Sequence, residues 1–531
     1  METITATKTL ERESSASATL EPFRSILFEA SQNGNSGLST EPPDFFRDLN
    51  LDQIVDAITS GRDEYDLKPY FYTRLTSLDA ITYRQEIMRD LERAAVFESL
   101  KLFAKQMRSV RQHRGTAEKA YYKYEKEAWL LDAVETYCEA VAELRDNMDQ
   151  AEIGSRGLMS FRAYLDRHAE SDQFAQLVQE ADAVSAGLSS IRYALLIRDG
   201  SVTVRRYESE IDYSAVVEQT FARFKQGAVK DYRVGFPAYT NLNHVEAAVL
   251  DRVALLYPDA FRALDEFCAK HADFLDTTIT VFDREIQFYI AYLEYIEPFK
   301  RKGLNFCNPQ ISDTSKHVSN RDGFDLALAG KLIRENKVVV CNDFTLSGRE
   351  RIFVVTGPNQ GGKTTFSRTF GQLHYLASLG CPVPGVEARL FLFDRLFVHF
   401  ERAEDITTLR GKLQDDLVRI HAILTEATPN STIIINEMVS STSVQDAIFL
   451  TRKVLEQISQ LDCLCVCVTF LDELASLNEK TVSIVAAVAR EDPTIRTYKL
   501  ERRPADGLAY AVAVAEKYHL TYDQLRERLK R

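Results

Sequence analysis

The chain has 531 residues, of which 45% are hydrophobic and 27% are charged, so it is long enough to form more than one globular domain. Its 78 acidic and 65 basic residues give a net charge of −13. This charge argues against nucleic acid bound over the whole surface, but it is compatible with a local basic groove that binds nucleic acid. No apolar run approaches the length of a membrane span, and no signal pattern opens the chain. We therefore expect a cytoplasmic protein with no membrane partner.

The N-terminal half of the chain is predicted to be mainly α-helical. Residues 1–50 are rich in Ser and Thr and have little periodicity, which predicts a largely disordered leader. Residues 51–320 follow the helical period, with apolar residues at steps of three and four in the segments 81–103, 125–148 and 245–271.

An insertion around residues 190–245 interrupts this helical pattern. Residues 193–198 and 201–205 alternate in polarity and flank Asp199 and Gly200, a pair typical of a two-residue turn. The insertion is therefore predicted to contain a small β-hairpin.

The pattern changes in residues 321–531. A polar connector at about residues 321–335 leads into the apolar segment 337–341, and short apolar strands then alternate with helices. This alternation is the signature of a parallel sheet with helical crossovers. The expected fold is a mainly α N-terminal half followed by an α/β domain.

Three cysteines alternate in the apolar segment 461–468. Cys463, Cys465 and Cys467 would share one face of a buried strand, where Cys behaves as a small hydrophobic residue. The alternative is a metal site, but zinc ligands have different spacings. We favour the core role and a reduced compartment.

The most specific motif is a glycine-rich loop that fits the phosphate-binding pattern G-x-x-x-x-G-K-[ST]. It follows a predicted strand at residues 352–356 and precedes a predicted helix at 366–379, so backbone N–H groups and the helix N-terminus can surround an anion. A chance match is the alternative, and the flanking strand and helix argue against it. The candidate nucleotide-binding residues are Gly357, Pro358, Asn359, Gln360, Gly361, Gly362, Lys363, Thr364 and Thr365.

A second polar group follows the buried strand predicted at residues 432–436. Asn436 stands where an Asp commonly supports Mg²⁺, and Glu437 stands where a Glu commonly acts on the attacking water. We expect Lys363 and Glu437 to be catalytic and Thr364 and Asn436 to hold Mg²⁺, more weakly than usual because Asn436 is neutral. The alternative is a buried strand that merely ends in two polar residues.

These segments resemble the MutS family of mismatch-repair ATPases. Residues 357–368 resemble its GPNxGGKST-x-x-R motif, and Thr442, Ser443 and Asp446 match its T-S-x-x-D segment. Weaker resemblances are found at residues 81–86 (the opening of its lever domain), 468–474 (its ATH-x-x-EL strand) and 506–511 (its DGSYGI turn).

The resemblance implies a helical core or lever domain at residues 51–320 and a P-loop ATPase domain of the MutS type at 321–531. It also implies ATP and Mg²⁺ as cofactors, a homodimer through the ATPase domain, and double-stranded or branched DNA as a partner in repair or recombination. No segment before residue 60 resembles the family's mismatch-reading or connector domain, so we expect something other than an ordinary mismatch sensor.

The chain departs from the family pattern at several positions. Asn436 replaces an Asp, residues 439–441 replace Gly-Arg-Gly, Phe470 replaces the family's switch His, and Val339 stands where the family often places an aromatic on adenine. Two hypotheses follow. The first is an ATPase slowed by Asn436 and Phe470, and the second is a nucleotide-gated DNA- or protein-binding switch or scaffold with negligible hydrolysis.

Three sets of basic residues are candidates for partner contacts. Arg410 and Lys412 lie where the family loop reaches the partner's site, although they could equally be solvated charges at a helix start. A stripe that could follow a DNA backbone, or could be an ordinary solvated helix face, consists of Lys101, Lys105, Arg108 and Arg111. A weaker DNA-binding candidate is the hairpin, with Arg198, Arg205 and Arg206.

Overall fold

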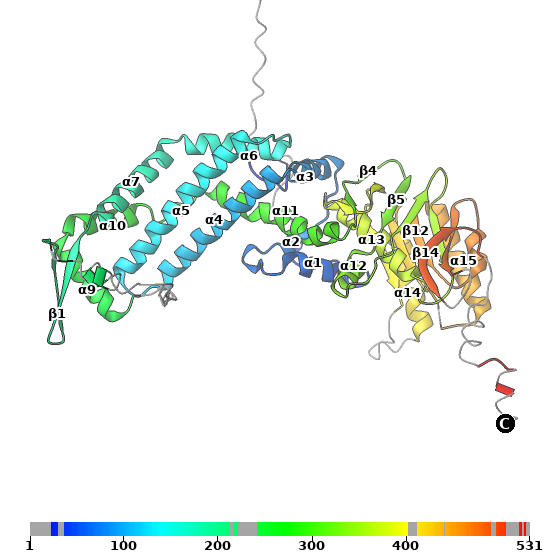
Figure 1. Ribbon diagram of the computed structural model, residues 1–531. Coiled ribbons are helices and arrows are strands. Elements are labelled where there is room, and N and C mark those ends of the chain that lie inside the picture. Colours follow the sequence, from blue (N-terminus) through cyan, green and yellow to red (C-terminus); the bar gives the residue numbers. More distant parts are fainter. Residues whose placement is uncertain are drawn as a thin grey trace, which may run out of the picture.

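The computed structural model describes residues 23–29, 37–209, 211, 216–217, 219–220, 242–401, 411–439, 441–489, 495–505, 520–522 and 525–526. An elongated helical half and an α/β half lie end to end (Figure 1). The coarse prediction of a mainly α part followed by an α/β part is confirmed. Among the described residues, no helix has the length and apolar character needed to cross a membrane.

The helical half is built on two long neighbouring helices, α4 (Ala94–Lys119) and α5 (Lys123–Gln150), and on α11 (Thr277–Arg301), which extends toward the α/β half (Figure 1). The other helices of this half are α1 (Leu51–Thr59), α2 (Lys68–Tyr72), α3 (Leu78–Asp90), α6 (Arg156–Ala169), α7 (Asp172–Ser189), α9 (His244–Leu256) and α10 (Pro258–Lys270).

The predicted helical segments are present, but two of them are divided. Segment 81–103 breaks between α3 and α4, and segment 245–271 breaks between α9 and α10 at Pro258. Proline lacks an N–H group and is tolerated in the first helical turn, so it begins α10 instead of continuing α9.

The predicted hairpin is confirmed. Strands β1 (Tyr193–Arg198) and β2 (Ser201–Arg206) pair antiparallel at the far end of the helical half (Figure 1). Asp199 and Gly200 both have positive φ, at 49° and 77°, which two-residue turns of this kind require.

The α/β half contains a six-stranded sheet in the order β10-β11-β12-β7-β13-β14. All neighbouring pairs are parallel except β13 and β14. The strands are β10 (Leu396–Phe400), β11 (Thr432–Asn436), β12 (Leu464–Val468), β7 (Ile352–Thr356), β13 (Thr481–Val488) and β14 (Arg496–Arg502). The helices α13 (Lys363–Ser378), α14 (Lys412–Glu426) and α15 (Val444–Leu461) alternate with them along the chain, so the predicted parallel sheet is confirmed.

The three cysteines lie where the core interpretation places them. Cys463, Cys465 and Cys467 all belong to one buried apolar cluster, whereas Leu464 and Val466 face the main core on the other side of the sheet. Burial raises the pKa of the Cys467 thiol to about 12, so this thiol stays protonated at neutral pH.

The polar connector predicted at residues 321–335 is wrong. This segment ends strand β5 (Val318–Gly323) and then forms α12 (Leu326–Arg334), whose polar side chains face outward and whose Leu326 is buried. The apolar segment 337–341 leads directly into strand β6 (Asn342–Leu346).

The sheet structure of the α/β half begins before the predicted boundary at residue 321. A four-stranded sheet in the order β4-β9-β5-β6 includes β4 (Gln310–Ser312) and β9 (Glu387–Phe391), and a small sheet pairs β3 (Phe306–Cys307) with β8 (Val383–Pro384). β3 and β8 have two residues each and β4 has three, so these strands are too short to show the alternation that identifies a strand in a sequence.

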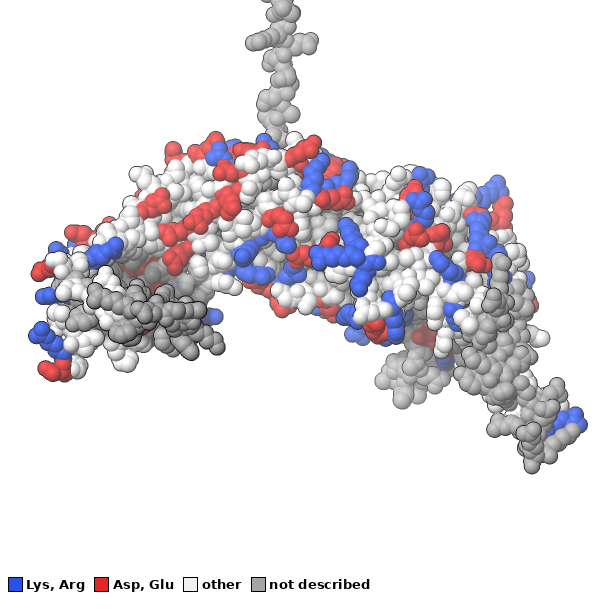
Figure 2. Space-filling view, viewed as in Figure 1, with Lys and Arg blue, Asp and Glu red and all other residues white. Residues whose placement is uncertain are grey.

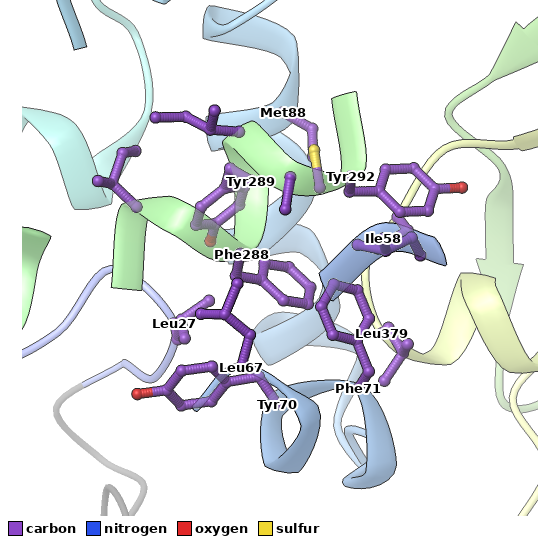
Figure 3. Packing of buried hydrophobic residues seen from close by; sticks show 14 of the residues in the cluster. Leu27, Ile58, Leu67, Tyr70, Phe71, Met88, Phe288, Tyr289, Tyr292 and Leu379 are labelled. Carbon is purple, nitrogen blue, oxygen red and sulfur yellow. The ribbon is translucent and has the colours of Figure 1, made fainter. Parts of the chain in front are cut away.

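The expectation of a disordered leader fails for residues 23–29 and 37–50. Phe23, Ile26 and Leu27 are buried, although no periodic pattern surrounds them. Figure 3 shows Leu27 beside Tyr289 and Phe288 of α11, in the apolar core where the helical half meets the α/β half.

Candidate functional site

The glycine-rich loop connects β7 to α13 and packs closely on β13. Gly357 and Gly362 have φ angles of 115° and 96°, which side chains other than glycine rarely adopt. A Cβ atom at Gly357 would lie 3.0 Å from Ala486, and one at Gly361 would lie 2.9 Å from it. Gly357 is therefore required by both backbone conformation and space, Gly362 by conformation and Gly361 by space.

Lys363 is the first residue of α13, and its side chain folds back over the loop. Its Nζ donates hydrogen bonds to the carbonyl oxygens of Gly357 at 2.8 Å and Pro358 at 3.2 Å. Burial lowers the pKa of Lys363, and the charge of Glu437 opposes this shift. The loop thus holds a single buried ammonium group at its centre.

Thr364 meets the end of β11. Its Oγ1 donates a hydrogen bond to Oδ1 of Asn436 at 3.0 Å. The parallel register aligns Asn436 with Val468 of β12 and Val468 with Val355 of β7, so these strands end at the same edge of the sheet. Neutral oxygen ligands such as these fit a Mg²⁺ ion that keeps several waters and takes its negative ligands from a substrate.

Glu437 follows Asn436 directly and is the last of the four predicted catalytic and metal-binding residues at this edge of the sheet. Its φ of 56° lies in the left-handed region, and its N–H donates to the Val468 carbonyl at 2.9 Å. Strained backbone of this kind is common at functional sites. The side chains of Lys363, Thr364 and Glu437 and the glycine-rich loop line one open cavity of about 330 Å³. Its lining includes Asn359, Gln360, Gly361, Gly362, Lys363, Thr364, Thr365 and Glu437.

Two further residues of this cavity were not predicted from the sequence. Leu328 of α12 and Tyr498 of β14 complete its lining. Neither belongs to a motif, and only a structure places them beside the loop. Val339, the position compared with the family's adenine-stacking aromatic, is half-buried and packs against the main core instead.

The remaining residues of the α/β half that the sequence analysis singled out do not line this cavity. Phe470 follows β12 and is 49% exposed. Lys412 at the start of α14 forms an ion pair with Glu401 of the same chain. Arg410 and the segment 506–511 are outside the described residues.

The basic stripe on α4 is largely engaged by acidic side chains. Lys101 pairs with Glu294 at 3.0 Å, Arg108 pairs with Glu64 at 2.9 Å, and Arg111 pairs with Asp283. These ion pairs favour the ordinary helix-face interpretation for three of the four residues, and Lys105 is exposed.

Charge on the visible face is mixed. Figure 2 shows acidic and basic side chains interspersed over both halves, with no continuous basic surface among the described residues of that view. On the hairpin, Arg198 is exposed, whereas Arg206 donates to the Leu256 carbonyl at 2.6 Å and lies over the ring of Tyr257. The predicted DNA contacts of the stripe and of the hairpin, seven basic residues in all, stay predictions.

Comparison with known proteins identifies the α/β half. The family model described as MutS domain V matches residues 353–526. The DNA mismatch repair protein MutS of Orientia tsutsugamushi (strain Boryong) is 31% identical over 182 residues, which are 34% of this chain and 20% of that protein. The C-terminal region of the chain is thus similar to the MutS family.

Two other relatives give the same result. The DNA mismatch repair protein MutS of Erythrobacter litoralis (strain HTCC2594) is 32% identical over 217 residues, 40% of this chain and 24% of the relative. That of Rickettsia akari (strain Hartford) is 35% identical over 148 residues, 28% of this chain and 17% of the relative. Each of these matches covers less than a quarter of the relative's own length.

Proposed function

We propose that this chain binds ATP with Mg²⁺, hydrolyses it slowly, and uses its nucleotide state to control how the helical half holds DNA. The observation that carries the proposal is the convergence of Lys363, Thr364, Asn436 and Glu437 on one edge of the sheet, with three of them lining one cavity. A buried ammonium, two neutral oxygen ligands and a carboxylate are the parts that phosphoryl transfer to water requires.

Each side chain has a separate part in this proposal. Lys363 leaves its carbonyl partners to bind the β- and γ-phosphates and stabilises the charge that develops during transfer. Glu437 orients the attacking water and accepts its proton. Thr364 and Asn436 hold Mg²⁺, which supplies positive charge to the phosphate oxygens. Turnover is slow because Asn436 adds no charge and Phe470 provides no imidazole.

The structure offers a physical route from the nucleotide to the helical half. Helix α13 begins at Lys363, and its side chains and C-terminal carbonyl are hydrogen-bonded to segments of the helical half. These bonds are Arg368 Nε to Asp48 O (2.9 Å), Gln372 Nε2 to Leu49 O (2.8 Å), Tyr375 Oη to Phe71 O (2.9 Å) and Arg84 Nη1 to Leu379 O (3.1 Å). A displacement of α13 on nucleotide binding would therefore move the helical half as well.

DNA is proposed as the partner because the matched relatives are DNA mismatch repair proteins. A homodimer through the α/β half is proposed because the glycine-rich loop and the segments around it resemble those of the MutS family. We propose a role in DNA repair or recombination that differs from the role of an ordinary mismatch sensor.

The proposal is tested by measuring ATP binding and phosphate release with Mg²⁺ for the wild type and two variants. We expect Lys363→Ala to lose ATP binding, and Glu437→Gln to keep binding but lose turnover by a factor of roughly 100 or more, as expected for loss of a general base. Glu479→Gln, an exposed carboxylate that pairs with Arg349, is the matched control. Full turnover in Glu437→Gln would contradict the catalytic assignment.

A second function is favoured by one observation, the amide of Asn436 bonded directly to Thr364. In this alternative the chain is a nucleotide-gated switch or scaffold that binds DNA or protein without hydrolysis. Wild-type turnover at background with intact ATP binding would support it.

A further inference from the structure

Residues 23–29 lie against α3, α6 and α11 without forming a helix or a strand. The ring of Phe23 packs edge-on against Phe161 of α6, with centroids 5.1 Å apart, and lies 6.4 Å from the ring of Phe282 of α11. Ile26 and Leu27 are fully buried. The segment therefore places apolar side chains on a surface formed by three helices, as an extended peptide does on a protein that binds it.

The backbone of the segment is bonded by side chains of these helices. Three consecutive carbonyl groups accept hydrogen bonds from α3 and α11, namely Ser25 O from Tyr83 Oη (2.7 Å), Ile26 O from Tyr289 Oη (2.6 Å) and Leu27 O from Arg84 Nε (3.0 Å). The Ile26 N–H donates to the Glu285 carboxylate at 2.9 Å. A segment of a helix or sheet satisfies its backbone with other backbone groups, whereas side chains satisfy this one.

Ser25 makes the most specific contact of the segment. Its hydroxyl donates to the Glu285 carboxylate at 2.8 Å and accepts from the N–H groups of Leu27 and Phe28, both at 3.0 Å. Ser25 and Glu285 are both buried. A hydroxyl fits this position, whereas a carboxylate at position 25 would face the carboxylate of Glu285.

The surface under the segment carries charged groups as well as apolar ones. Arg84 is fully buried, and its guanidinium lies between the rings of Phe28 and Phe288, at 5.2 and 5.0 Å from their centroids. A mainly apolar surface with a few placed polar groups is typical of a ligand site. Departure of the segment would return Arg84 and Glu285 to water, and the recovered hydration would offset part of the lost contacts.

The same arginine joins the segment to the end of α13. Its Nε donates to the Leu27 carbonyl, and its Nη1 donates to the Leu379 carbonyl at 3.1 Å. A Cβ atom at Gly380 would lie 2.7 Å from Arg84 Cβ, so the chain that leaves α13 runs directly over α3. Occupancy of the surface by residues 23–29 is thus connected to the contact between α3 and α13.

We propose that α3, α6 and α11 form a peptide-binding site, and that residues 23–29 occupy it as a tethered ligand that leaves and rebinds as a unit. The site takes an extended apolar peptide with a hydroxyl side chain that bonds Glu285. Its occupancy holds α3 against the end of α13. Neither nucleotide nor DNA has a part in this inference, so it stands or falls separately from the proposed function.

The test places the recognition sequence of a specific protease at residues 31–36 of the full chain. After cleavage, only non-covalent contacts retain the N-terminal fragment, and a labelled synthetic peptide of residues 20–30 competes for its place. Exchange of fragment and peptide is followed by fluorescence anisotropy, and circular dichroism checks that the remaining chain stays folded. We expect the labelled peptide to replace the fragment, with saturable binding and no loss of helical signal.

Peptide variants identify the contacts without altering the folded chain. Ser25→Asp should bind at least roughly tenfold more weakly, because it places two carboxylates together. Phe23→Ala should also lose roughly tenfold or more, since it removes a buried aromatic anchor. Arg24→Gln is the matched control in the same segment, and because Arg24 is exposed it should bind within about twofold of the wild-type peptide.

Amide hydrogen exchange tests the connection to α13. Removal of the fragment should speed exchange in α3 and in residues 376–381, addition of the peptide should reverse this, and β12 should not change. A fragment that never exchanges with the peptide, or that leaves only when the chain unfolds, would overturn the proposal and make the segment an integral part of the core. Equal affinity of the Ser25→Asp and wild-type peptides, or unchanged exchange in α3, would overturn it as well.

Discussion

At the residue scale, the proposed role of Asn436 is to set how much negative charge the site offers a metal ion. Its amide oxygen accepts the Thr364 hydrogen bond at 3.0 Å, and Glu437 next to it is a carboxylate that lines the cavity. A carboxylate at position 436 would have nearly the same shape and would add a full charge. Near a protein surface, one added charge a few ångströms from a cation contributes about 1–4 kcal/mol.

Asn436→Asp is therefore expected to lower the Mg²⁺ concentration needed for half-maximal turnover by roughly tenfold, which corresponds to about 1.4 kcal/mol. The measurement is a Mg²⁺ titration of phosphate release at saturating ATP. Asn430→Asp, at an exposed position before the other end of β11, is the control and should leave the titration unchanged. An unchanged Mg²⁺ requirement in Asn436→Asp would argue against the metal-side role of this residue.

A second residue-scale prediction concerns Glu285, which lies on α11 and is only 3% exposed. It accepts hydrogen bonds from the Ser25 hydroxyl at 2.8 Å and from the Ile26 N–H at 2.9 Å. Burial nevertheless raises the pKa of Glu285 to about 7, against the opposing effects of these bonds and of Arg84. Because the folded state binds the proton more tightly than the unfolded state, stability falls as the pH rises through this range.

Glu285→Gln should therefore flatten the pH dependence of the free energy of unfolding between about pH 5 and about pH 8, by up to about 3 kcal/mol. Denaturant unfolding at the two pH values measures this. Glu297→Gln, a more exposed change on the same helix, should retain the wild-type dependence. Identical curves for wild type and Glu285→Gln would show that Glu285 is ionised throughout the range.

At the element scale, α13 is the connection between the site and the helical half. Tyr375 is 1% exposed, and its hydroxyl donates to the Phe71 carbonyl of α2 at 2.9 Å. Figure 3 shows Phe71 and Leu379 together in the core between the two halves. Replacing Tyr375 by Phe removes this donor from the Phe71 carbonyl, while the aromatic ring at position 375 still fills the same space in the core.

Tyr375→Phe is expected to lower the free energy of unfolding by about 0.5–1.5 kcal/mol, the net value of one buried hydrogen bond. ATP affinity should stay near the wild-type value, whereas the effect of ATP on DNA binding should shrink. Urea unfolding measures the change in the free energy of unfolding, and DNA binding with and without ATP measures the change in the nucleotide effect. Tyr522→Phe, at a 76% exposed position, is the control, and a large loss of ATP affinity in Tyr375→Phe would contradict a purely transmitting role.

Local patterns predicted those elements whose determinants lie close together in the sequence. The apolar run of β7, the glycine-rich loop and the Asp199-Gly200 turn each contain their own signal. The packed segment at residues 23–29 does not, because its partners Glu285 and Tyr289 are about 260 positions away along the chain. Tyr498 was missed for a similar reason, since its place beside the loop depends on the pairing of β14 with β13.

At the scale of the whole molecule, the site lies in one half and the elongated helices lie in the other (Figure 1). Their junction is an apolar core that also contains the segment 23–29, fixed by Arg84, Tyr289 and Glu285. A junction of this kind transmits rigid displacements, because close-packed cores do not deform continuously. Nucleotide state in the α/β half is therefore expected to change the position of the distant helices.

ATP at the glycine-rich loop is proposed to control DNA binding by the helical half. The most direct measurement is the affinity of the full chain for duplex, branched and single-stranded DNA with ATP, with ADP and without nucleotide, at about 50 and about 200 mM salt. We predict an affinity that changes with the nucleotide in the wild type, does not change with it in Lys363→Ala, and weakens steeply with salt. DNA affinity that is the same in all nucleotide states, or no DNA binding by the wild type, would contradict the account.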